Sequence, residues 1–411
     1  LVDLCGRLPL AIRIAATRLR SRRSETVDRL RDRLADETRR LSELESGRRD
    51  IAAAIETTFQ DLGQRQRRGF ACLGAIPGSH FDLSAAAVAM DEDTDTAESI
   101  LNELTELHLI QELGPDRFGF HDLLRLYALH LHAGNATDVL GRVAAHYLRL
   151  ATGVSDQLTP YVHGGGHTGE SGIDSHAAAR AWLDTERANL LALIDALAAN
   201  RSLQLVWSLA SEIGDHYLYR GQLPTVEHAL AAGMAAAREA KSTRGLALMH
   251  YGLGRCAEFR GRHDEAHELF KQALVDASAA GDARTRSRVL MAAAGINYRL
   301  GRYDDAGDCC LQAIELDSAD GVDSSPAVFN TLGVIAMDQG KLREAAEFLL
   351  RAAEAENRYP SGNIHIVQFS LSMVHYQLGD LDEAYDYATS ALDSCRRIGA
   401  RKYEPIYLSA L

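Results

Sequence analysis

The sequence contains few proline, cysteine and aromatic residues. Only 8 prolines and 6 cysteines occur among 411 residues, and aromatic side chains make up 6%. Few prolines and aromatics, together with abundant alanine and leucine, favour helices over sheets. The cysteines form no C-x-x-C pair and keep no recurring spacing from histidines, which argues against a zinc site and a disulfide framework. We expect a mostly α protein without a metal site, in a reduced, cytoplasmic setting.

Long apolar runs are also missing. No run approaches the roughly 18 residues that would span a bilayer, and the first residues do not form a charged and then apolar leader. We therefore expect no membrane partner. The chain is long enough for more than one compact unit. Because it starts at Leu1 inside a helical pattern, we expect it to be part of a larger protein.

Positive charge is scarce where nucleic-acid binding would need it. The formal net charge is -13, and residues 151–411 hold 24 Lys and Arg against 34 Asp and Glu. Between Ser79 and Asp116 there is no Lys or Arg, while ten acidic residues occur. Binding to phosphates draws on clustered Lys and Arg. We expect no direct contact with nucleic acid, and a protein, peptide or small-molecule signal as the partner.

A spaced pattern of small residues recurs in the second half of the chain. Each of four glycines is followed by alanine five residues later, and a second alanine stands seven residues beyond the first. A small residue precedes each glycine by seven. The glycines are Gly261, Gly301, Gly340 and Gly379, spaced 40, 39 and 39 residues apart. Glycine suits a tight turn between antiparallel helices, and small residues let helix backbones approach to about 8–10 Å. With a weaker copy at Gly221, about five helical hairpins are predicted.

This pattern resembles tetratricopeptide repeats in a lengthened form of about 40 residues. The period alone would equally suit HEAT or armadillo units, but the small-residue framework favours the tetratricopeptide assignment. The resemblance covers roughly residues 205–400, and residues 402–411 look like the first helix of a further repeat. Such repeats stack, so that neighbours bury each other's apolar faces. We predict a superhelical array over residues 201–411.

The resemblance implies that the first helix of each hairpin lines a concave groove. The positions carried over are Tyr251, Arg255, Phe259, Met291, Tyr298, Arg299, Asn330, Met337, Phe369, Met373 and Tyr376. Aromatic, Met and Arg residues are favoured at binding surfaces, but each aromatic or Met side chain could equally pack within the array. We predict a ligand groove formed by Tyr251, Arg255, Tyr298, Arg299, Asn330, Phe369 and Tyr376. Its polar members, Arg255, Arg299 and Asn330, are the stronger candidates for ligand contact.

The sequence of residues 47–133 predicts helices followed by a hairpin. Helical patterns cover residues 50–60, 64–73, 83–90 and 94–107, and another helix resumes at Asp122. Two short apolar-bearing segments flank the turn signal Gly114-Pro115-Asp116. Helices followed by a small hairpin describe a winged helix.

Two motifs in this part resemble those of NB-ARC nucleotide switches of the STAND class. Residues 5–12, with Leu8-Pro9-Leu10, resemble the GLPL motif, and Phe120-His121-Asp122 resembles the Met-His-Asp motif. The resemblance implies that Pro9 packs against adenine and that His121 donates a hydrogen bond to the β-phosphate of bound ADP. The alternative is that His121 only satisfies a helix N-terminus. Arg7 replaces the first glycine of the motif, which puts close approach of the backbone to a nucleotide in doubt.

Together with the repeats, these motifs make the chain similar to the C-terminal part of AfsR-type actinobacterial regulators of antibiotic production. The chain lacks a Gly-x4-Gly-Lys-Ser/Thr loop, and Gly340-Lys341 is followed by leucine. We therefore expect no cofactor and no ATP hydrolysis in this chain, but ADP or ATP with Mg²⁺ in a full-length protein with an upstream nucleotide-binding domain. Oligomerisation on activation is a further expectation.

The predicted organisation has four parts: a helical ARC-type segment at 1–46, a winged helix at 47–133, a helical linker with a glycine-rich loop at 134–200, and the repeat array at 201–411. No Ser-His-Asp or Cys-His constellation stands out, so we expect no enzyme. The leading hypothesis is the sensor and autoinhibitory region of a STAND-type transcriptional regulator. The alternative is a free-standing tetratricopeptide adaptor or peptide receptor without nucleotide control.

Overall fold

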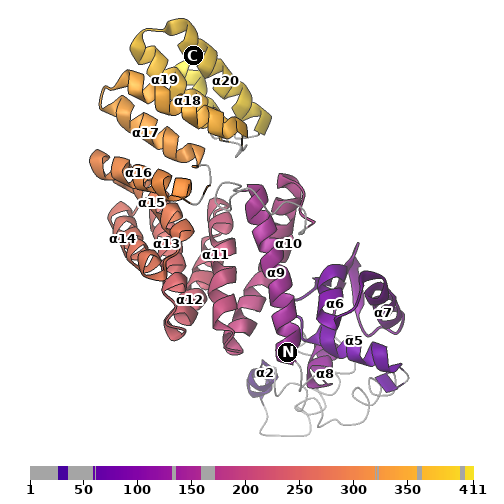
Figure 1. The fold of residues 1–411 in the computed structure, drawn as a ribbon. Helices are drawn as coiled ribbons and strands as arrows, with labels where there is room; N and C mark the ends of the chain where they lie inside the picture. The colour runs from indigo at the N-terminus through magenta and orange to yellow at the C-terminus, as the bar shows by residue number, and fades with distance from the viewer. Residues whose placement is uncertain are drawn as a thin grey trace. The chain divides into compact units, whose positions relative to one another are not determined.

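A computed structural model describes residues 26–35, 59–60, 62–131, 136–158, 172–319, 321, 324–358, 363–398 and 403–411. It is mostly α with one small sheet and a helical-repeat array, which confirms the predicted fold class (Figure 1). The chain divides into two compact units. Unit 1 comprises Leu1–Tyr147 and Glu186–Asn200, and unit 2 comprises Leu148–Thr185 and Arg201–Leu411. The four-part organisation stays a prediction.

Unit 1 combines short helices with a three-stranded antiparallel sheet of order β1-β3-β2. Its elements are α2 (Val27–Ala35), α5 (Gln64–Gly74), β1 (Phe81–Asp82), α6 (Leu83–Met90), α7 (Thr94–Glu106), β2 (Gln111–Gly114), β3 (Arg117–Gly119) and α8 (Asp122–Leu131). The hairpin forms at the predicted turn, where Asp116 adopts a φ of 53°. Strand β1 was not predicted, because two residues give no periodic signal. Nearly all of the helix predicted at 50–60 lies outside the described residues.

Aspartates fix where two of these helices begin. The Asp82 carboxylate accepts from the backbone N–H of Ala85 at 2.7 Å, and the Asp93 carboxylate accepts from that of Thr96 at 2.9 Å. Each bond satisfies a donor that the first helical turn leaves free. The acidic residues between 79 and 116 therefore include helix caps.

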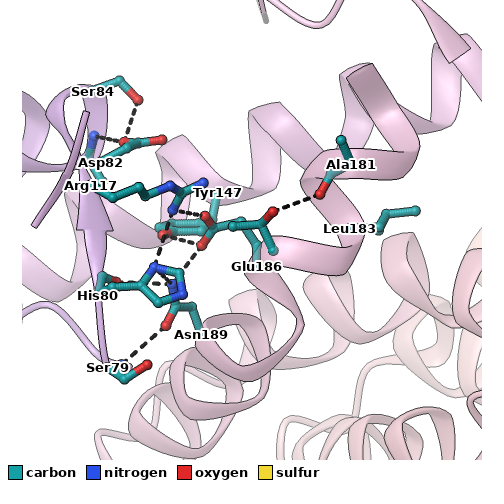
Figure 2. A network of polar contacts seen from close by, with 12 residues as sticks. Ser79, His80, Asp82, Ser84, Arg117, Tyr147, Ala181, Leu183, Glu186 and Asn189 are labelled. Atoms are coloured by element: carbon teal, nitrogen blue, oxygen red, sulfur yellow. Dashed lines mark hydrogen bonds and ion pairs between the residues drawn. The ribbon is translucent and has the colours of Figure 1, made fainter. Parts of the chain in front are cut away.

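Two long helices, α9 (Ala136–Leu158) and α10 (His176–Ala199), each contribute residues to both units. In unit 1, the second half of α10 is fastened to the sheet by a buried network that we call the latch, made by His80, Arg117, Tyr147, Glu186 and Asn189 (Figure 2). The Glu186 carboxylate is 1% exposed and pairs with Arg117 at the start of β3. It also accepts from Tyr147 Oη at 2.9 Å and Asn189 Nδ2 at 2.7 Å. Three donors on one carboxylate compensate its burial.

The latch extends to the loop before β1. Asn189 Nδ2 donates to the His80 carbonyl at 3.0 Å, and Asn189 Oδ1 accepts from Ser79 N at 3.2 Å. Arg117 Nη1 donates to His80 Nδ1 at 3.2 Å. Gly78 has a φ of +106°, and a Cβ there would lie 2.1 Å from Asn189 Oδ1. Only glycine fits this close approach.

Unit 2 consists of successive helical hairpins. They are α11 (Leu203–Tyr219) with α12 (Leu223–Glu239), α13 (Thr243–Phe259) with α14 (His263–Ala280), α15 (Ala283–Arg299) with α16 (Tyr303–Ala319), α17 (Pro326–Asp338) with α18 (Leu342–Arg358), and α19 (Ile364–Leu378) with α20 (Leu381–Ile398), followed by α21 (Glu404–Ala410). The turn glycines of all five hairpins, Gly221 included, adopt positive φ between 69° and 89°. These are left-handed conformations that favour glycine.

The small residues of the repeat lie where helices meet. Ala266 and Ala273 of α14 are completely buried. A Cβ on Gly254 would lie 2.5 Å from Phe270 Cε1, and one on Gly333 would lie 2.6 Å from Leu349 Cγ. The spacing read from the sequence therefore marks close helix packing within each hairpin. Among the helices that the structure describes, none is both long and apolar enough to cross a membrane.

Candidate ligand groove

The first helices of three successive hairpins, α11, α13 and α15, carry one connected set of polar side chains. We call it the groove cluster, and its members are Asp215, Tyr219, Tyr251, Arg255, Glu258, Arg288 and Arg299. The repeat aligns them: Asp215 and Arg255 each stand six residues before a turn glycine. Equivalent positions on stacked hairpins face the same way, so side chains from distant parts of the sequence meet.

Asp215 is the centre of one half of the cluster. Its Oδ2 accepts from Tyr251 Oη and from Arg288 Nη2, both at 2.8 Å, and its Oδ1 lies 3.6 Å from Arg255 Nε. Burial alone would raise the pKa of this carboxyl, but the Arg288 and Arg255 guanidinium groups outweigh it and hold the pKa at about 2. Asp215 is therefore a carboxylate at neutral pH.

Glu258 is the centre of the other half. It accepts from Arg255 Nη1 and, at 2.5 Å, from Arg299 Nη1. Arg255 Nη2 also reaches Tyr219 Oη at 2.5 Å. The cluster is thus a chain of ion pairs in the order Arg288, Asp215, Arg255, Glu258, Arg299, with an arginine at each end.

Aromatic rings support two of the arginines. The Arg288 guanidinium carbon lies 4.3 Å from the centre of the Tyr251 ring, and that of Arg255 lies 5.3 Å from the centre of the Tyr219 ring. Such cation–π contacts stabilise partly desolvated guanidinium groups. Burial and the nearby Asp215 carboxylate raise the pKa of Tyr251, which keeps its hydroxyl as a donor. The arrangement supplies fixed cationic donors on rigid helices.

Predicted groove residues outside the cluster have different surroundings. Tyr298 Oη donates to Asp338 of α17 at 2.8 Å, and burial with this hydrogen bond raises the pKa of Tyr298 to about 12. Asn330, also on α17, has a buried Oδ1 without a hydrogen-bond partner among the described residues. Tyr376 is 65% exposed.

Several apolar members of the predicted groove take part in packing. The Phe369 ring lies 4.9 Å from that of Tyr407 of α21, against a core that includes Leu392. Met291 and Met337 each pack against a core cluster shared by their own hairpin and the next, whereas Phe259 is exposed. The ligand-contact role of the predicted residues stays a prediction.

Four members of the groove cluster lie outside the groove predicted from the sequence: Asp215, Tyr219, Glu258 and Arg288. For Asp215 a signal existed, because it precedes Gly221 by the same interval that separates Arg255 from Gly261. The weaker alanine pattern of the first hairpin hid it. Arg288 stands three residues before Met291, on the same helix face, but outside the positions that the resemblance supplies.

Of the two residues predicted to contact nucleotide, Pro9 lies outside the described residues. His121 immediately precedes α8, is half-buried, and its Nε2 contacts Gln111 Nε2 of β2. Its neighbour Phe120 packs at 5.4 Å from the Phe70 ring and 6.1 Å from the Phe81 ring, so phenylalanine provides the apolar packing expected of methionine in the motif. Contact between His121 and ADP stays a prediction.

A second polar contact in unit 2 joins a serine and a histidine, the residue types that serve as nucleophile and base in many hydrolases. Ser155 Oγ lies 2.8 Å from His216 Nε2, but both side chains are buried. A nucleophile must be reached by its substrate. We therefore assign this pair to packing.

The helical hairpins with a polar first-helix face define a tetratricopeptide region, and the family model described as "Tetratricopeptide repeat" matches residues 287–320. The relatives found by sequence are regulators. The chain is 33% identical over 344 residues to the regulatory protein AfsR of Streptomyces griseus, which is 78% of this chain and 34% of the relative. It is 37% identical over 226 residues to AfsR of Streptomyces coelicolor, which is 50% of this chain and 23% of the relative.

These matches confirm the inferred resemblance: the chain is similar to AfsR-type regulators, and it spans about a third or less of their length. Among solved structures, a signal transduction ATPase with numerous domains (STAND) protein with a tetratricopeptide repeat sensor from Pyrococcus horikoshii is 13% identical. That match covers 88% of this chain and 61% of the other, with a TM-score of 0.40.

Proposed function

We propose that this chain is the sensor and autoinhibitory region of a STAND-type transcriptional regulator, and that a protein, peptide or small-molecule signal binds the groove of its repeats. The groove cluster carries the proposal. Two successive first helices, α13 and α15, place arginine donors on one face, next to the Asp215 and Tyr219 side chains of α11. The two tyrosines that contact these arginines are a residue type enriched at binding hot spots. The similarity to regulatory proteins supports the same role.

In this proposal, unit 1 includes a winged helix that transmits the state of the groove to a nucleotide module upstream. The order helix, strand, two helices and hairpin supports the winged helix. The absence of Lys and Arg from Ser79 to Asp116 supports signal transmission over DNA contact. A signal bound in the groove and ADP bound at the nucleotide module would shift the equilibrium between the resting and the active state of the regulator in opposite directions.

The groove is tested in the full-length regulator, with Arg255 and Arg288 both changed to Gln. We expect this double variant to lose its response to cell extract containing the signal, read as nucleotide release, while basal nucleotide occupancy stays unchanged. Arg262→Gln with Arg284→Gln is the matched control, because both arginines lie on the same hairpins and are exposed. An unchanged response in the groove variant would argue against the proposal.

The nucleotide side is tested by His121→Ala in the full-length protein. Loss of a charge-assisted hydrogen bond to the β-phosphate should weaken ADP retention by about tenfold or more and raise basal activity. Gln111→Ala, which removes the contact of the ring but keeps the imidazole, is the control and should retain ADP. Equal ADP occupancy in wild type and His121→Ala would contradict the assigned role.

The adaptor hypothesis makes the opposite prediction for the coding sequence upstream of Leu1. A regulator of the proposed class has a Gly-x4-Gly-Lys-Ser/Thr loop there, since that loop holds the phosphates. An upstream sequence without this loop would favour a tetratricopeptide adaptor that works without nucleotide.

A further inference from the structure

His80, in the loop before β1, presents one ring nitrogen to two side chains of the latch (Figure 2). Its Nδ1 lies 3.2 Å from Arg117 Nη1 and 3.1 Å from Asn189 Nδ2. A guanidinium group has donors and no acceptor, so Arg117 can only donate to this nitrogen. The orientation of the Asn189 amide decides whether the second neighbour is a donor as well.

Three hydrogen bonds fix the orientation of the Asn189 amide. The backbone N–H of Ser79 donates to Asn189 Oδ1 at 3.2 Å, which makes this atom the acceptor. Nδ2 donates to the Glu186 carboxylate at 2.7 Å and to the His80 carbonyl at 3.0 Å. The reverse orientation would set the amide oxygen against a carboxylate and the amide N–H against a backbone N–H. Both neighbours of His80 Nδ1 are therefore donors.

Two donors determine where the imidazole ring carries its proton. A neutral imidazole has one N–H and one acceptor nitrogen. Because Nδ1 of His80 accepts in the latch, the proton of the neutral ring lies on Nε2. A further proton on Nδ1 would turn the acceptor into a donor that faces two donors, with a positive charge 3.2 Å from the Arg117 guanidinium. The closed latch is therefore incompatible with the imidazolium form.

The anionic and neutral groups around the ring are already engaged. The Glu186 carboxylate of α10 accepts three hydrogen bonds within the latch. Burial and this carboxylate raise the pKa of Tyr147, on α9, well above its ordinary value, so its hydroxyl stays neutral. Asp82, two residues after His80, caps α6. None of these groups in the described structure is a free anion for an imidazolium at position 80.

The cationic groups near the ring oppose a second positive charge. Arg117 of β3 faces it directly, and Arg125 of α8 reaches the same loop, where it donates to the Gly78 carbonyl at 2.8 Å. A protonated His80 would place another cation beside the single Glu186 carboxylate that pairs with Arg117. The ion pair that joins the sheet to α10 would then be weakened.

We propose that His80 is a proton-operated switch within unit 1: the latch stays closed while Nδ1 is unprotonated, and a proton on Nδ1 releases the second half of α10 from the sheet. Histidine is the side chain that ordinarily changes its charge between about pH 5 and 8. The first half of α10 belongs to unit 2, so the proton acts on a helix that both units share. The inference is independent of a groove ligand and of nucleotide.

The first measurement locates the ring proton in the complete 411-residue wild-type chain. Two-dimensional ¹⁵N–¹H spectra of histidine rings distinguish the two neutral tautomers and the imidazolium, and the His80 ring is assigned through its backbone resonances. At pH 8 we expect the tautomer with the proton on Nε2. A neutral ring that carries its proton on Nδ1 would refute the acceptor role from which the switch is inferred.

The second measurement follows the latch as the pH falls. Hydrogen exchange of the amides in β3 and in the second half of α10, corrected for the intrinsic effect of pH on exchange, reports opening. Uptake of one proton on opening changes the opening equilibrium by up to about tenfold per pH unit. We expect protection to fall by about tenfold or more between pH 7.5 and 5.5, over the same range in which the His80 ring becomes an imidazolium.

A substitution by asparagine separates the acceptor from the proton. Asparagine places its Oδ1 where histidine has Nδ1, so His80→Asn keeps an acceptor for Arg117 and Asn189 but cannot be protonated. We expect this variant to keep its protection from pH 7.5 to 5.5. His108→Asn is the matched control, because His108 is an exposed histidine of unit 1 with a φ of 57°, which asparagine tolerates. This control should lose protection as the wild type does.

Three results would overturn the switch. Equal loss of protection in His80→Asn and wild type would assign the effect to another group, such as Glu186 or the buried His146 of α9. Full protection in wild type while the His80 ring is an imidazolium would show that the latch accommodates the proton. Loss of protection while the ring is still neutral would show that acid opens the latch elsewhere.

Discussion

The latch in unit 1 and the groove cluster in unit 2 are both ion-pair networks that include tyrosines, but they differ in how fully their polar groups are paired. In the latch, one carboxylate receives three donors, and none of the five side chains is left with a buried partnerless atom in the described structure. In the groove cluster, three cations share two carboxylates, and two buried guanidinium nitrogens, Nε of Arg255 and Nε of Arg288, have no hydrogen-bond partner among the described residues. A closed network fits a structural role, whereas an unfilled network fits a role in binding.

The largest effect is expected at the latch. Arg117→Gln leaves the Glu186 carboxylate, 1% exposed, with two neutral donors, so the variant should lose about 3–5 kcal/mol of stability. Hydrogen exchange of the amides in β3 and in the second half of α10 measures this. Arg201→Gln breaks an exposed pair with Glu239 and should cost less than about 1 kcal/mol. If Arg117→Gln is as stable as Arg201→Gln, the latch does not hold the fold together, and the difference in role between the two networks is refuted.

A smaller effect is expected when acid titrates the groove cluster. The folded pKa of Asp215 is about 2, below its ordinary value of 3.8, so its contribution is fully present above about pH 4 and is lost as the pH falls towards 2. The shift corresponds to roughly 2 kcal/mol. Both tryptophans, Trp182 and Trp207, belong to unit 2, so their fluorescence in urea at each pH reports on this unit. Asp215→Asn should flatten the pH dependence of unfolding between about pH 4 and 2; an unchanged slope would contradict the assigned ion pairs.

The smallest effect is expected for Tyr251→Phe. The variant removes one hydrogen bond to Asp215, which keeps both arginines, so we expect a loss of about 1 kcal/mol. The phenylalanine ring still supports Arg288. Tyr147→Phe is the matched change in the latch and should cost about 1.5–3 kcal/mol, because Glu186 is more deeply buried. Equal losses in the free energy of unfolding for the two substitutions would mean that the two networks stabilise the fold to the same extent.

The sequence was sufficient to predict elements that local chemistry determines. Glycines with positive φ and alanines in helix contacts recur at a fixed interval, so the repeats could be recognised from the order of residue types alone. The wing hairpin followed from its turn residues in the same way. These features depend on neighbours within about 40 residues.

The networks could not be predicted in the same way. Arg117 and Glu186 are 69 residues apart and meet only because α10 returns to the sheet, and Asp215 and Arg288 are 73 residues apart and meet across three hairpins. Charged residues on helices more often face solvent than each other. Pairing over such intervals depends on how hairpins stack, which composition and spacing do not encode. Arg255 was identified because its position in the repeat could be transferred.

The structural role of the latch and the binding role of the groove cluster are tested most directly by making the same Arg→Gln substitution in both networks. Arg288→Gln leaves Asp215 with Arg255 and Tyr251, so we predict a stability loss of no more than about 1–2 kcal/mol by tryptophan fluorescence in urea. Arg117→Gln should lose at least twice as much by hydrogen exchange. An Arg288→Gln variant that loses as much stability as Arg117→Gln would show that the groove cluster holds the fold together, and would contradict its assignment as a binding site.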